Sequence, residues 1–150
     1  MNTLKDIKGL VGILSIKVIE VSTGKVLDSF TDNNLIVNTG KTNITKLLGG
    51  SGGFNLNTVG VGTNATAPAV TDTALTPSSG NMVGVDSVTY PDSKTVQFNF
   101  TIGTGVANGL DINEFGLIDD DGSLFSRKVR ATISKTSSII LVGAWQISIA

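Results

Sequence analysis

Residues 110–150 contain three strand-like runs, and this pattern limits the fold more than any other part of the chain. Runs 112–118 and 124–133 flank an acidic turn at 119–122, and a Ser/Thr-rich link leads to a third run, 139–149. In the third run one parity holds Leu141, Gly143, Trp145, Ile147 and Ile149. A period of two is typical of half-buried antiparallel strands, so the segment predicts a β-meander with the only tryptophan in the core.

Residues 95–102 alternate more strictly still. One parity is apolar and the other is polar, with Val96, Phe98, Phe100 and Ile102 against Thr95, Gln97, Asn99 and Thr101. Together with the run 83–90 and a turn at 91–94, this segment predicts a β-hairpin. Many short strands with turns between them predict an all-β fold. We expect one domain, residues 1–150, that folds as an antiparallel β-sandwich with one short α-helix.

The N-terminal third predicts a further hairpin. Residues 13–21 and 26–30 are strand-like, and the turn signal 22–25 separates them. Asp and Asn at 32–34 predict that the chain turns again before a short strand at 35–37. This part of the chain therefore predicts three strands in close succession.

Residues 41–48 predict the only helix. Asn38 or Thr39 would cap its beginning, and Gly49-Gly50 would end it. Helical spacing places three apolar residues on one face: Ile44, Leu47 and Leu48.

Gly, Ser and Thr dominate the segments that follow the helix. Residues 49–53 have the composition of a flexible linker within the domain, and 58–62 predict a brief strand. Residues 63–81 predict a long loop with one helical turn near 72–75, and we expect this loop to become ordered against a neighbouring subunit. The polar N-terminal arm, residues 1–9, is a second candidate for contacts between subunits.

The composition excludes several functional classes. The chain has no cysteine and no histidine, which removes disulfides, thiolate metal sites and the commonest general base. Its net charge of -1 predicts no attraction to nucleic acid. Charged residues make up 15% of the chain, below the roughly 25% usual for soluble domains. A surface of hydroxyls and amides loses its water cheaply, so this composition favours self-assembly.

No segment predicts membrane insertion. The apolar patch at residues 10–14 is short and lies close to the charges of Lys8 and Lys17. A membrane-spanning helix needs about 20 apolar residues, and a secretory signal needs a longer apolar core.

Two glycine motifs suggest nucleotide binding, but both lack essential parts. The run 35–42, LIVNTGKT, ends like a phosphate loop, yet Leu35 occupies the position of the first glycine that such a loop requires. Residues 60–65 partly match a dinucleotide fingerprint, but Pro68 follows directly and no βαβ pattern surrounds them. We interpret both motifs as turns or helix starts.

The acidic residues do not predict a catalytic or metal site. In a calcium loop at Asp119, the first and last ligands would be Leu117 and Lys128, so a structural turn is the better interpretation. Glu114 could pair across a hairpin with Arg127 or Arg130, and an exposed pair of this kind contributes about 0–1 kcal/mol. We assign no catalytic, cofactor-binding or metal-binding residue, expect no cofactor, and leave the binding residues unidentified.

Two stretches resemble virion proteins of tailed bacteriophages. The first is 59–68, VGVGTNATAP, followed by Asp-Thr-Ala-Leu at 72–75. The second is a β-meander with Glu-Phe-Gly-Leu at 114–117, Asp-Gly-Ser-Leu at 121–124, Arg127 and Ile-Ser-Lys-Thr at 133–136, which ends in Trp-Gln-Ile at 145–147. The resemblance covers about residues 58–150 and includes tail, baseplate and fibre-associated proteins.

The resemblance implies a non-enzymatic structural protein of the virion, made in the host cytoplasm. Its partners would be copies of itself and other virion proteins in the tail, tail fibre or baseplate. Two alternatives remain open: a capsid decoration or head-fibre protein, and a receptor- or carbohydrate-binding module. An exposed aromatic cleft would favour the binding module.

Overall fold

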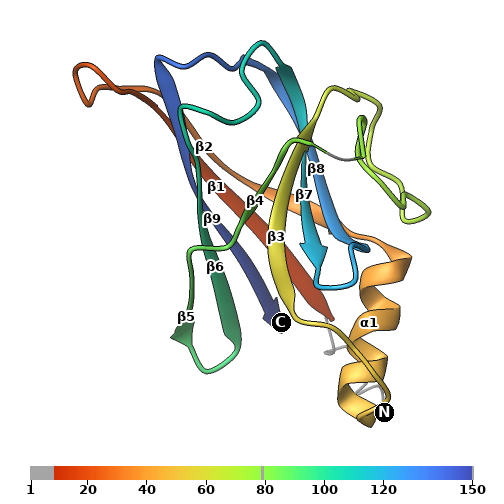
Figure 1. Ribbon diagram of the computed structural model, residues 1–150. Coiled ribbons are helices and arrows are strands. Elements are labelled where there is room, and N and C mark those ends of the chain that lie inside the picture. The colour runs from red at the N-terminus through yellow and green to blue at the C-terminus, as the bar shows by residue number, and fades with distance from the viewer. Residues whose placement is uncertain (1–8, 79, 150) are drawn as a thin grey trace, which may run out of the picture.

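The computed structural model describes residues 9–78 and 80–149, which form one curled antiparallel sheet with a helix beside it (Figure 1). The strand order across the nine-stranded sheet is β4-β3-β7-β8-β2-β1-β9-β6-β5. In chain order the elements are β1 (Leu10–Glu20), β2 (Val26–Ile36), α1 (Asn38–Gly49), β3 (Leu56–Gly62), β4 (Met82–Gly84), β5 (Ser87–Asp92), β6 (Thr95–Ile102), β7 (Asp111–Asp119), β8 (Leu124–Ser134) and β9 (Ile139–Ile149). The all-β prediction with one short helix is confirmed, whereas the sandwich is not.

The inner face of the curled sheet encloses the main core. Strands far apart in the sheet order contribute to the same cluster of buried side chains, among them Val61 of β3, Phe100 of β6 and Trp145 of β9. The predicted alternation in β6 and β9 is confirmed, because Phe98, Phe100, Leu141 and Trp145 are all buried. The right-handed twist of strands accumulates across a sheet, and the curl of this one brings its apolar face around the core.

A two-residue crossing joins the two edges of the sheet. β4 pairs with β3 at one edge and β5 pairs with β6 at the other. Between them, the Val85 N–H donates to Asn57 O at 2.9 Å and the Asp86 N–H donates to Asn99 O at 2.7 Å. The prediction of one strand over 83–90 was therefore wrong. Residues Pro91 and Asp92, predicted as a turn, belong to β5.

β2 is longer than predicted. The residues at 32–34, predicted as a turn, pair in register with β1, for example Leu14 with Asp32 and Gly12 with Asn34. The long β1 strand offers backbone partners along its length, and this ladder outweighs the local turn preference of Asp and Asn. The Asn34 side chain also accepts a hydrogen bond from Trp145 Nε1 at 3.3 Å.

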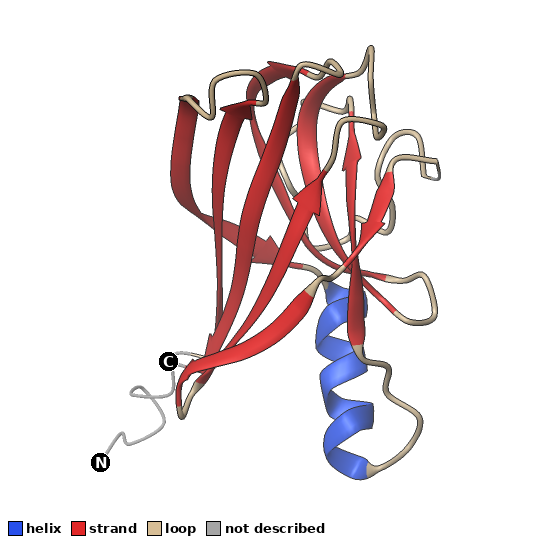
Figure 2. Cartoon of the chain, turned by 60° about the vertical axis from the view of Figure 1, so that its left-hand side comes forward, coloured by secondary structure: helices blue, strands red, loops and turns tan. Residues whose placement is uncertain are grey.

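α1 stands at one end of the sheet (Figure 2). It begins at Asn38, earlier than predicted, and Val37 occupies the N-cap position without a side-chain hydrogen bond. Gly50 ends the helix in a left-handed conformation, as predicted. Gly40 and Asn43 are the buried residues of α1, and Gly40 lies directly against the backbone of Phe125.

Leu47 and Leu48 are exposed, and Leu48 keeps 84% of its surface accessible. Ile44 is partly buried against the main core. The chain after the helix returns along it, since the Asn43 side chain accepts from the Phe54 N–H and donates to the Phe54 carbonyl oxygen. The flexibility of residues 49–53 stays a prediction.

The hairpin of β7 and β8 and the third strand β9 agree closely with the predicted meander. Asp119 closes the acidic turn, because its Oδ1 accepts hydrogen bonds from the N–H groups of Asp121 and Ser123 at 3.0 and 2.9 Å. This geometry is that of a structural turn. Residues 1–8, most of the predicted N-terminal arm, lie outside the described residues.

Candidate functional site

Glu114 and Arg127 form a buried ion pair beneath the long loop. They lie on the paired strands β7 and β8, and Arg127 Nε is 2.9 Å from Glu114 Oε1. Their side chains are 0% and 1% exposed, respectively. The sequence named this pair but predicted it at the surface with little effect on stability. That prediction was wrong, because the loop between Asn64 and Thr76 covers the pair.

The same pair holds the loop in place. Arg127 Nη2 donates to the carbonyl oxygens of Asn64 and Thr66 at 3.1 and 3.0 Å, and Arg127 Nη1 lies 2.9 Å from Asp72 Oδ2. Glu114 Oε2 accepts hydrogen bonds from the N–H groups of Asn64 and Thr76, both at 2.9 Å. The loop thus has polar partners in its own chain, while contact with a neighbouring subunit stays a prediction.

Loop residues 72–75 are not helical, so the predicted turn of helix was wrong. Asp72 instead accepts a hydrogen bond from the Ala69 N–H at 2.9 Å through the same Oδ2 that contacts Arg127. The salt bridge to Arg127 ties this local turn to the sheet.

Three glycines make room for the loop. A Cβ on Gly62 would lie 2.5 Å from Glu114 Oε2 and 2.6 Å from Thr76 O. Cβ atoms on Gly60 and Gly116 would lie 2.8 and 3.0 Å from Leu75. The two glycines that loosely match a dinucleotide fingerprint therefore allow close packing of the loop against β3.

An apolar groove lies between α1 and the β5–β6 hairpin. We call it the α1 groove. It has a volume of about 760 Å³, and its floor includes the core residues Phe98, Phe125 and Ile147. The remaining lining residues are Leu10, Asn43, Ile44, Leu47, Phe54, Asn55, Leu56, Asn57, Val88, Tyr90, Ser93, Lys94, Thr95, Val96 and Ile149.

The polar atoms around the α1 groove are few, and several are already engaged. Asn43 uses its side-chain oxygen and nitrogen on the backbone of Phe54, and Asn57 Nδ2 donates to Asp120 Oδ1 at 3.0 Å. Within the lining drawn from the described residues, Lys94 is the charged side chain. The groove is therefore suited to an apolar partner.

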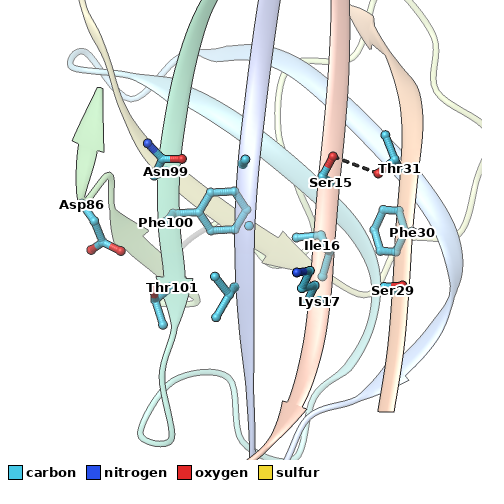
Figure 3. Close-up of a pocket in the computed structure, with 13 residues that line it drawn as sticks. Ser15, Ile16, Lys17, Ser29, Phe30, Thr31, Asp86, Asn99, Phe100 and Thr101 are labelled. Carbon is cyan, nitrogen blue, oxygen red and sulfur yellow. Dashed lines mark hydrogen bonds between the residues drawn. The ribbon is translucent and has the colours of Figure 1, made fainter. Parts of the chain in front are cut away.

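A second hollow lies on the face of the sheet, and we call it the sheet trough (Figure 3). It has a volume of about 580 Å³ and crosses β2, β1, β9 and β6. Small polar side chains contribute much of its lining, and some bind each other, as Ser15 and Thr31 do at 3.0 Å. Lys17 and Asp86 are its charged side chains. The trough offers a nearly neutral surface with many hydroxyl and amide groups.

Lys135 is a buried cation that sequence analysis missed. It is 1% exposed, and its Nζ donates to Asn108 Oδ1 at 3.0 Å and to the Thr136 carbonyl oxygen at 2.9 Å. Both partners are uncharged, and burial lowers the pKa of the Lys135 ammonium below its ordinary value of 10.5. The backbone of Lys135 also pairs with Gly109 and Leu110, so this residue links loop 103–109 to the segment before β9.

Trp145 lies in the core, as predicted, with none of its surface exposed. Gly40-Lys41-Thr42 lies near the beginning of α1. The interpretation of this motif as a helix start is therefore confirmed. Residues 9–78 and 80–149 contain no group of three or more His, Cys, Asp or Glu side chains that could hold a metal ion. The part of the chain that the structure describes also contains no helix long and apolar enough to cross a membrane.

The fold and its surfaces define a curled antiparallel β domain with an apolar groove at one end and a nearly neutral sheet face. Comparison of the chain with protein-family models, with curated proteins and with solved structures finds no match.

Proposed function

We propose that this chain is a non-enzymatic structural component of a tailed-bacteriophage particle, in its tail, tail fibre or baseplate. It acts by symmetric assembly with copies of itself and with other virion proteins. The two halves of its sheet serve as the layers of a sandwich-like unit. They meet between β2 and β8, where two residue pairs join them: Leu35 with Arg127 and Ile36 with Ser126.

The observation that carries the proposal is the contact between the two stretches that resemble phage virion proteins. Residues 59–75 supply Gly60, Gly62, the loop carbonyls and Leu75, and the meander supplies Glu114, Gly116 and Arg127. The residues that carry the resemblance therefore hold one loop firmly against one sheet. A rigid loop on a β scaffold suits a protein that positions its neighbours.

The chemistry of Glu114 supports a structural role for this pair. Both of its carboxylate oxygens accept hydrogen bonds, and the side chain is fully buried. A general base must reach the proton that it removes, and this carboxylate is covered by its own loop.

The surfaces support assembly. The α1 groove is apolar, and the sheet trough carries neutral hydroxyls and amides with two charged side chains. Surfaces with little charge lose water at low cost when two subunits meet.

The mass of the full chain in solution tests this proposal. Light scattering on a sizing column should give a discrete oligomer, such as a trimer, hexamer or larger ring. A monomer at every concentration would contradict self-assembly and would favour a capsid decoration protein that binds a different neighbour.

One observation favours a binding module as the second candidate. Tyr90 and Phe54 both line the α1 groove and are both exposed, and aromatic side chains of this kind can stack on sugars. A screen of the purified protein against host polysaccharides tests this alternative. Binding that a Tyr90→Ala change abolishes would replace the structural proposal with the binding module.

A further inference from the structure

The apolar residues at the rim of the α1 groove form a large exposed patch. Six large apolar side chains are exposed there, between 39% and 84% each: Leu47, Leu48, Phe54, Val88, Tyr90 and Ile149. Together these side chains leave on the order of 600 Å² of apolar surface in contact with water. The largest patch on a typical monomer is about 300–600 Å² and is often functional, so this patch lies at the upper end of that range.

These six residues lie together at one end of the molecule. All except Leu48 line the groove, and Leu48 follows Ile44, a lining residue, by one turn of α1. Figure 1 shows α1, the β5–β6 turn and the end of β9 at this same end of the sheet. We call this surface, groove and six rim residues together, the groove face.

We propose that the groove face is the contact surface between two copies of this chain. The inference rests on the proposed function, because it names the surface through which that assembly would occur. A stable interface buries about 800 Å² on each partner, and the rim residues supply most of that area.

The shape of the groove face supports a second copy as its occupant. The face has a hollow of about 760 Å³ and, beside it, two prominent side chains, Leu48 and Tyr90, which are 84% and 75% exposed. A projecting side chain of one copy can therefore enter the hollow of the next. Such a contact is isologous in a dimer and heterologous in a closed ring, and in both cases every copy buries the same residues.

The charge of the groove face also fits contact with an identical surface. Identical surfaces bring like charges together, and this repulsion is costly when many charged groups are present. The described lining of the groove contains the single cation Lys94, so two copies meet with little repulsion. Tyr90 is of a residue type enriched in the buried centres of interfaces.

The substitution Leu48→Lys tests the proposal directly. Leu48 is exposed on the last turn of α1, where a cation is compatible with the helix, so the fold should be unaffected. An unpaired ammonium placed in an apolar contact should raise the dissociation constant of the oligomer on the order of 100-fold. Sedimentation velocity of the full chain over a range of concentrations measures this change.

Leu27→Lys is the matched control. Leu27 lies on β2, away from the groove, and is also exposed, so the same change of residue type should alter the dissociation constant by less than about threefold. Circular dichroism and thermal melting of both variants verify that each is folded. Tyr90→Lys should repeat the effect of Leu48→Lys from the other wall of the groove.

The outcomes separate this inference from the proposed function. An oligomer that survives Leu48→Lys and Tyr90→Lys but dissociates with Val142→Lys in the sheet trough would overturn the inference, while self-assembly would stand. A wild-type chain that stays monomeric would overturn both. Stronger association after deletion of residues 1–8 would mean that the chain's own arm fills the groove, and this too would overturn the inference.

Discussion

Arg127 uses all three of its guanidinium nitrogens inside the protein. Nε contacts Glu114, Nη1 contacts Asp72, and Nη2 donates to two carbonyl oxygens of the loop at residues 63–81. Removing one member of a buried ion pair leaves the other charge without compensation, which costs about 3–5 kcal/mol. We therefore expect Arg127→Met to lower the free energy of unfolding by that amount. Urea unfolding, followed by the fluorescence of Trp145, measures it.

Lys128→Met is the control for this change. Lys128 is the next residue of β8, and its Nζ lies 3.4 Å from Asp32 Oδ2 in a pair that is accessible to solvent. Exposed pairs contribute about 0–1 kcal/mol, so the control should unfold at nearly the wild-type urea concentration. Equal losses in the two variants would mean that burial of the Glu114 pair has no energetic consequence.

Lys135 predicts a pH dependence of stability. Burial lowers the pKa of its ammonium in the folded protein, whereas the unfolded chain keeps the ordinary value of 10.5. Between these two values the unfolded state binds more protons, so the Lys135 contribution to the free energy of unfolding rises with pH in that window. Urea unfolding from pH 7 to 10.5 should show this increase in wild type relative to Lys135→Met. A constant difference between the two proteins across that range would contradict the role of Lys135.

At the scale of elements, β3 and the loop depend on the absence of a side chain at Gly62. A Cβ there would press on the Thr76 carbonyl oxygen and on Glu114, and the backbone atom cannot move without displacing the loop. We expect Gly62→Ala to lower the free energy of unfolding by at least about 2 kcal/mol. Gly84→Ala on β4 is the control, since nothing lies within 4 Å of its Cβ. Urea unfolding of both variants distinguishes the two sites.

Hairpins were the elements that sequence analysis predicted best, because alternation and turn residues are local signals. The β7–β8 hairpin and β9 needed no other information. The prediction of a turn at 32–34 was wrong because β1 supplies backbone hydrogen-bond partners that local composition does not reveal. The prediction of one strand over 83–90 was wrong because this run divides between the two edges of the sheet, which only the curled shape of the sheet brings together.

The candidate surfaces were harder to predict than the strands. The sequence indicated Glu114 and Arg127 as partners, but their burial depends on loop residues about 50 positions earlier in the chain. The α1 groove was missed because no local pattern reveals how much of α1 the sheet covers. Helical spacing places Leu47 on the same face as Gly40 and Asn43, yet the sheet covers only the beginning of α1, where Gly40 lies against Phe125.

At the scale of the whole molecule, the low charge of the chain predicts how its assembly responds to salt. Surface ion pairs weaken as salt screens them, whereas apolar contacts do not. With an apolar groove face and a net charge of -1, the proposed oligomer should keep its dissociation constant within about threefold between 0.05 and 0.5 M sodium chloride. Sedimentation velocity at the two salt concentrations measures this. A dissociation constant that rises tenfold or more would indicate contacts made by charged side chains.

The pairing of β1 with β9 has a consequence for synthesis on the ribosome. β1 leaves the exit tunnel before β9, and its register with β9 runs from Leu10 with Ile149 to Glu20 with Ile139. Until β9 emerges, the edge of β1 that β9 covers has no backbone partner from β9, and an open strand edge of this kind can pair with another chain. The sheet can therefore be completed only after β9 has been synthesised.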